Sequence, residues 1–300
     1  MIGDMENTTD TLQRFLFEHA PVRGELVRLD EAWQTILERH DYPPLLRDLL
    51  GELAAAAVLL AATLKLQGAL VLQIQGNGPL KLLVVECSGD LQVRATAKWT
   101  EELRQGELSQ LVGEGRFVIT LDPGDGKQSY QGIVPLEGNS VAEMLRNYML
   151  RSEQLDTRLW LAADDKCATG MLLQILPAQP DQAEHPDADA WPRATQLADT
   201  LKRDELLMLP AREIVHRLYH EEDIRLFEPQ SVEFHCSCSR QSVGNMLKML
   251  GHAEVDSILE ERGSIEIHCE FCNQRYEFDN VDAAQLFSET IPAAGSETRH

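Results

Sequence analysis

The sequence predicts an α+β fold with a largely antiparallel sheet domain and packed helices, a helical linker region and a small C-terminal domain. Three observations lead to this expectation. Strand-like segments joined by short turns crowd residues 69–176, as antiparallel sheets require. A proline-rich, acidic stretch follows, and four of the six cysteines then fall within residues 236–272. We therefore expect an N-terminal core domain at 1–178, a metastable linker at 179–232 and a C-terminal domain at 233–300.

The core domain is expected to contain four helices, at residues 9–19, 29–39, 45–66 and 140–152. The third is the clearest, because the run from Leu53 to Leu64 is apolar except for Thr63. A membrane span needs about 20 such residues, so this run predicts a buried helix. The fourth begins at Ser140, a favourable N-cap residue. Alternating or mostly apolar segments predict strands at residues 69–75, 80–85, 91–97, 116–121, 130–135, 158–162 and 171–176.

The linker region combines helical segments with many charges. We expect helices at residues 194–208 and 211–221, whose apolar residues at helical spacing need a partner surface. The segment is too small to form a core of its own. It should therefore dock on the first domain, and only marginally.

The C-terminal domain is expected to have short helices at 242–250, 255–261 and 281–287, and a hairpin formed by residues 264–268 and 274–278. A unit of this size buries little apolar surface. Structural zinc typically contributes about 10–16 kcal/mol of apparent binding free energy to small domains. We therefore expect this unit to fold with metal and to unfold without it.

The metal ligands expected are the cysteines of a C-x-C pair, Cys236 and Cys238, and of a C-x-x-C pair, Cys269 and Cys272. Two close pairs of thiolates match a tetrahedral structural zinc site, so we expect one Zn²⁺ per chain in the reduced state. Thiolate ligands also react with oxidants, and a disulfide within either pair would remove two ligands at once. The open question is whether the site is only structural or also a redox switch.

Other candidate groups have simpler interpretations. His235 and His268 each precede a cysteine, but neighbours in extended chain point to opposite sides, so neither is expected to be a ligand. Cys87 and Cys167 are isolated and are expected to behave as small apolar residues. P-loop, GxSxG, HExxH and dinucleotide-binding motifs are absent from the sequence, and no catalytic residues are assigned. We therefore do not expect an enzyme.

The formal charge of −22 disfavours binding to nucleic acids and to anionic membranes. The N-terminal residues lack the apolar stretch of a secretory signal, and cysteine is sparse outside the cluster. Both features indicate a cytoplasmic protein. A zinc-ribbon module that recruits a protein or RNA partner is one alternative function, and a thiol oxidoreductase that uses the C-x-x-C pair is another.

Several segments resemble the 33 kDa heat-shock protein family, the redox-regulated, ATP-independent holdase chaperones of bacteria. The resemblance covers nearly the whole chain. Its clearest parts are the cysteine blocks 234–240 and 267–272. Further matches lie at residues 14–18, 22–27, 130–134, 149–155 and 218–222.

The resemblance implies an inactive reduced protein with zinc on Cys236, Cys238, Cys269 and Cys272. Oxidation during unfolding stress would form the disulfides Cys236–Cys238 and Cys269–Cys272 and release the metal. The C-terminal unit and the linker would then open. The chain would form a homodimer and hold unfolding client proteins without ATP, protecting them from aggregation under oxidative and heat stress.

Overall fold

The computed structural model describes residues 9–64, 67–100, 103, 106–124, 126–177, 187 and 189–288. The chain forms two compact units, Met1–His235 and Cys236–His300. The first unit contains the described part of the predicted linker region. The predicted difference in stability between core domain and linker stays a prediction. No helix within the described ranges is long and apolar enough to cross a membrane.

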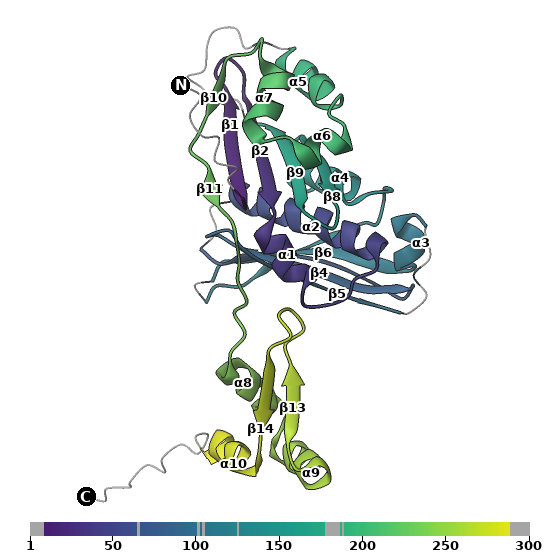
Figure 1. The fold of residues 1–300 in the computed structure, drawn as a ribbon, viewed down its shortest axis with the longest axis vertical. Helices are drawn as coiled ribbons and strands as arrows, with labels where there is room; N and C mark the ends of the chain where they lie inside the picture. The colour runs from purple at the N-terminus through teal and green to yellow at the C-terminus, as the bar shows by residue number, and fades with distance from the viewer. Residues whose placement is uncertain are drawn as a thin grey trace, which may run out of the picture. The chain divides into compact units, whose positions relative to one another are not determined.

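The first unit is built from two largely antiparallel sheets (Figure 1). One has the strand order β10-β1-β2-β9-β8, with β11 also paired to β1. The other has the order β12-β5-β4-β3-β6-β7, in which only the β12–β5 pair is parallel. The strands are β1 (Thr11–Phe17), β2 (Val22–Leu29), β3 (Ala69–Gly76), β4 (Leu80–Ser88), β5 (Gln92–Trp99), β6 (Gly115–Asp122), β7 (Tyr130–Val134), β8 (Thr157–Ala163), β9 (Ala168–Ile175), β10 (Ile224–Leu226), β11 (Gln230–Ser231) and β12 (Glu233–Phe234).

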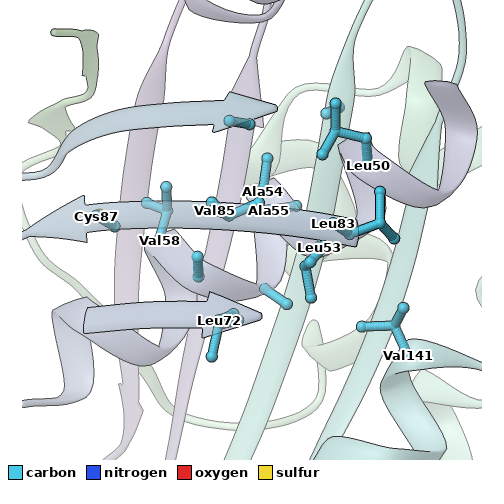
Figure 2. Close-up of a cluster of buried hydrophobic side chains, with 14 of the residues drawn as sticks. Leu50, Leu53, Ala54, Ala55, Val58, Leu72, Leu83, Val85, Cys87 and Val141 are labelled. Atoms are coloured by element: carbon cyan, nitrogen blue, oxygen red, sulfur yellow. The ribbon is translucent and has the colours of Figure 1, made fainter. Parts of the chain in front are cut away.

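Helix α2 forms the centre of the first unit, because it contacts strands of both sheets (Figure 1). Its apolar run is buried on all sides, as expected for a helix between two sheets. Figure 2 shows Leu53 and Val58 of this helix among Leu72, Leu83 and Val85 of the second sheet. The helices of the unit are α1 (Glu31–Leu37), α2 (Pro44–Thr63), α3 (Leu108–Val112), α4 (Val141–Arg151), α5 (Ala190–Ala198), α6 (Arg203–Met208) and α7 (Ala211–Tyr219).

The predicted α+β class and the predicted strands between residues 69 and 176 are confirmed. The helix predicted at residues 9–19 is wrong, because Thr11–Phe17 forms strand β1 and pairs with β2 over six residue pairs. The single helix predicted at 194–208 is also wrong: it is divided into α5 and α6 by residues 199–202. The end of the helix predicted at 45–66 lies partly outside the described residues.

The linker helices dock on one face of the first sheet, as predicted. Buried residues of α5, α6 and α7 share a cluster with Phe15 and Phe17 of β1 and with residues of β2, β8 and β9. Tyr219 at the end of α7 is central to this contact. Its ring lies 5.9 Å from that of Phe15 and 5.0 Å from that of Phe17, and its hydroxyl donates to the carbonyl of Ala194 at 3.1 Å.

The second unit contains α8 (Arg240–Leu250), α9 (His252–Arg262), β13 (Ile265–His268), β14 (Arg275–Phe278) and α10 (Asn280–Ser288). These confirm the three helices and the hairpin predicted there. Its buried core is small and consists of Leu247, Val255, Leu259, Ile265, Phe278 and Ala283. So small a core agrees with the expectation that the unit needs a further cross-link to be stable.

Candidate metal centre

The four predicted cysteines converge in the second unit. Cys236 and Cys238 lie in the segment that leads into α8, and Cys269 and Cys272 lie in the turn between β13 and β14. The Sγ atoms of Cys236 and Cys269 are 3.7 Å apart, and those of Cys238 and Cys272 are 3.3 Å apart. All four sulfur atoms lie within 4.8 Å of one another. Two segments more than 30 residues apart therefore present their thiols to one point.

This separation matches a metal-centred tetrahedron. Zinc–sulfur bonds of about 2.3 Å arranged tetrahedrally place the sulfurs about 3.8 Å apart. The observed contacts are close to this value, so the four cysteines can hold one metal ion. Four protein ligands leave no open position for a substrate or water, which is typical of structural rather than catalytic sites.

Local backbone geometry positions the second pair. The N–H of Cys269 donates to the carbonyl of Gln274 at 3.0 Å, and the N–H of Asn273 donates back to the carbonyl of Cys269 at 2.8 Å. Asn273 has a φ of 56°, in the left-handed region that Asn tolerates better than most residues. The turn therefore folds back tightly and turns both thiols to the same side.

The first pair is positioned by the start of α8. Ser239, directly after Cys238, caps this helix, because its hydroxyl accepts from the N–H of Ser242 at 3.1 Å. The N-terminus of a helix carries a partial positive charge, which favours a thiolate beside it. Arg240 then ties the helix to the rest of the unit. It donates to the Glu277 carbonyl, pairs with Asp282 at 2.7 Å and lies 4.4 Å from the ring centre of Phe278.

Tyr276 contacts the sulfur cluster, a contact that the sequence interpretation missed. Its hydroxyl donates to the Sγ atom of Cys238 at 3.1 Å. This hydrogen bond raises the pKa of Tyr276 to about 12. Its position four residues after Cys272, on the strand that follows the turn, was the only available signal.

Burial raises the pKa of the Cys238 and Cys272 thiols, and the Tyr276 hydrogen bond opposes this at Cys238. Thiols in such a site favour their neutral form unless a cation compensates the charge of the thiolates. A divalent metal supplies that charge and displaces the protons. Binding of a metal at this site would therefore be coupled to deprotonation of the four thiols.

The remaining candidates are not members of the sulfur cluster. The ring of His268 contacts Glu266 at 2.7 Å and Asn273 at 3.2 Å, and neither His235 nor His268 belongs to the sulfur cluster. Cys87 and Cys167 are buried in the apolar clusters of the first unit, and Figure 2 shows Cys87 on β4. Burial raises the pKa of Cys87 to about 12 and that of Cys167 to about 11, so both are poor nucleophiles.

Comparison with known proteins agrees with this architecture. The model of the Hsp33 protein family matches residues 10–279. A 33 kDa chaperonin of Methylobacillus flagellatus is 59% identical over 97% of this chain and 99% of its own length. A 33 kDa chaperonin of Chromobacterium violaceum is 57% identical over 98% of this chain and 99% of its own length. The crystal structure of a 33 kDa chaperonin of Thermotoga maritima superposes with a TM-score of 0.80 at 24% identity, covering 93% of this chain and 98% of that one.

The structural likeness supports the fold alone, because its sequence identity is low. The family model covers most of the chain and both units, and the two relatives align along nearly their whole length. The chain is therefore a member of the Hsp33 family of chaperones.

Proposed function

We propose that the protein is a redox-switched holdase, which binds unfolding proteins without ATP after its cysteines have been oxidised. In the reduced state, Cys236, Cys238, Cys269 and Cys272 hold one Zn²⁺, and the chaperone is inactive. The observation that carries this proposal is the cluster of four sulfur atoms within 4.8 Å, in a unit whose described residues, 236–288, form a hydrophobic cluster of six buried side chains.

The switch depends on how much of the unit's stability comes from the metal. Apparent zinc-binding free energies of about 10–16 kcal/mol in small domains are as large as the whole stability of a typical protein, about 5–15 kcal/mol. A core of six buried side chains, surrounded mostly by surface ion pairs, contributes little folding free energy to the second unit once zinc is lost. Metal release should therefore unfold the second unit.

Oxidation supplies the trigger. In each pair, two thiolates reduce one hydrogen peroxide to two hydroxide ions and form one disulfide, Cys236–Cys238 or Cys269–Cys272. Zinc leaves because disulfide sulfurs no longer act as anionic ligands. In the folded unit the short contacts join cysteines of different pairs. Unfolding stress that loosens the unit during oxidation lets the cysteines that are close in sequence meet at a lower cost in chain entropy than cysteines of different pairs.

The linker connects this event to client binding. Helix α7 lies over the aromatic rings of β1, and the chain that follows it leads directly to Cys236. Unfolding of the second unit removes the restraint at the end of this segment. The helices then release an apolar face, and exposed apolar surface binds other apolar chains. The net charge of −22 would keep the opened protein in solution.

The proposal includes the other properties implied by the family. The oxidised chain associates into homodimers in the cytoplasm and acts on client proteins rather than on nucleic acids or membranes. It has no catalytic residues and is not an enzyme. Acidic side chains outnumber basic ones by 49 to 27, which supports the exclusion of polyanionic partners.

An aggregation assay without ATP tests the proposal. Zinc-loaded, reduced protein and peroxide-treated protein are each added to a thermally unfolding model client, and light scattering and released zinc are recorded. We expect suppression only by the oxidised protein, together with zinc release. Equal suppression by both forms, or by neither, would refute the switch. Loss of activity on oxidation and chelation would instead favour a zinc-ribbon module.

A further inference from the structure

Strand β1 has a partner on each side, and the two partners differ. On one side it pairs with β2, a strand in the interior of its sheet. On the other side it pairs with a segment that we call the strap, residues 224–235, which includes β10, β11 and β12. Ladder pairs join the strap to β1 near both ends of the strand, at Phe15–Phe17 with β10 and at Thr11 and Leu12 with β11, while β12 pairs with β5.

Few side chains of the strap are buried: Ile224 and Phe234 pack partly buried against the core, and Arg225 forms a surface ion pair with Glu18. Val232 is the single strap residue that is fully buried, whereas Leu226 and Phe227 are exposed. Backbone bonds make most of the contact, such as those from the N–H of Phe227 to the Arg14 carbonyl at 3.0 Å and from Val232 to Asp10 at 2.8 Å. Segments with few buried side chains open at low free energy. The edge of β1 is therefore covered by a readily removed strand.

The face of β1 beside this edge is apolar and has its own cover. Phe15 and Phe17 contact Tyr219, which ends α7, and only four residues separate Tyr219 from the strap. One continuous segment, residues 211–235, thus covers both the hydrogen-bonding edge and the aromatic face. Its release would uncover both together.

We propose that β1 is the strand on which an extended client segment docks after the strap and α7 have left. The client pairs with the edge of β1 in place of the strap and lays alternate apolar side chains on Phe15 and Phe17. This inference rests on the proposed holdase function. Main-chain pairing needs no particular sequence, so it suits a chaperone that must accept many unfolded chains.

A second copy of this chain is a poorer occupant. The strap of another molecule would fit the same edge, but this one strand pairing would then have to hold together two chains of net charge −22 each. The edge spans only seven residues, Thr11–Phe17, which is small for a stable dimer interface and suitable for the transient capture of an extended segment. We therefore assign the edge to a client chain of lower negative charge.

Amide hydrogen exchange of the full-length protein tests this assignment, with urea-unfolded, alkylated lysozyme as the client. We expect slow exchange of Thr11–Phe17 in the reduced form and at least about tenfold faster exchange in the oxidised, client-free form. Client should restore slow exchange. Strand β7, also at a sheet edge, serves as the internal control and should not respond to the client.

A matched pair of variants isolates the role of main-chain pairing. Because Arg14 accepts a bond from the strap, the peptide groups of alternate residues, including Leu16, face the same edge. Leu16→Pro removes the backbone N–H, whereas Leu16→Ala shortens the side chain but keeps the backbone N–H. In the fully oxidised state, the proline variant should bind client at least about fivefold more weakly than the alanine variant.

Each remaining outcome decides against a specific claim. Fast exchange of β1 while client is held, or equal affinity of the two variants, would overturn the docking strand and leave the holdase intact. Protection of β1 without client that grows with protein concentration would assign the edge to a second copy. Failure of the oxidised wild type to hold any client would refute the proposed function itself.

Discussion

Tyr219 is the residue through which the account of the linker can be tested most sharply. It is almost fully buried, its ring contacts both Phe15 and Phe17, and its hydroxyl donates to the Ala194 carbonyl. Tyr219→Ala removes a buried aromatic ring, which typically costs about 3–5 kcal/mol. A loss of about 4 kcal/mol from linker docking shifts that equilibrium roughly 1,000-fold toward the open form.

Tyr219→Phe is the matched control. It keeps the ring contacts and loses only the hydrogen bond, which is worth about 1 kcal/mol or roughly a fivefold shift. The assay compares reduced, zinc-loaded proteins by limited proteolysis of the linker, suppression of client aggregation and zinc content. We expect Tyr219→Ala to be cleaved rapidly and to be active without oxidant while it retains zinc, and Tyr219→Phe to resemble the wild type. A Tyr219→Ala protein that is inactive and resistant to protease would refute the reasoning.

Three further predictions concern the metal site and pH. Cys272→Ser should bind no zinc and should leave the second unit unfolded in reducing buffer, as seen by loss of dispersed amide signals. Cys87→Ser and Cys167→Ser should keep one zinc per chain by metal analysis, and loss of zinc in either would show that the ligand set is wrong. Burial raises the pKa of Glu25 to about 7, so its protonated form stabilises the first unit fully below pH 4.5 and this stabilisation is lost as pH rises through 7. Glu25→Gln should reduce the fall in unfolding free energy between pH 5 and 8 by up to about 3 kcal/mol in urea titrations. Part of this decrease in unfolding free energy should remain in the Glu25→Gln variant, since burial raises the pKa of Glu52 to about 7 as well.

The metal centre was predictable because its signal lies in residue type and spacing. Four thiols in two close pairs have few other uses in a chain without disulfide-scaffold composition. The contact of Tyr276 with Cys238 was not predictable in the same way, because one tyrosine in a short strand has many ordinary roles. Only the folded hairpin shows which sulfur it reaches.

Strand β1 shows why part of the fold was misread. Leu12, Phe15 and Leu16 have the spacing of one helix face, and nothing within the segment marks it as a strand. Its strand conformation is set by pairing with β2 and with the strap, which is more than 200 residues away in sequence. The strap is mostly exposed, and its strands are only two or three residues long, too short for a periodic pattern to indicate them. Pairing with strands distant in sequence, rather than a local sequence preference, therefore set the conformation of both β1 and the strap.

The most direct test of the redox switch follows zinc release and linker opening in one experiment. Peroxide is added to the reduced protein at a temperature that favours unfolding, and a zinc-sensitive dye and amide exchange of residues 211–235 are recorded together. We predict that linker exchange accelerates with the same time course as metal release. Complete zinc loss with a linker that stays protected, or linker opening with zinc fully retained, would contradict the account.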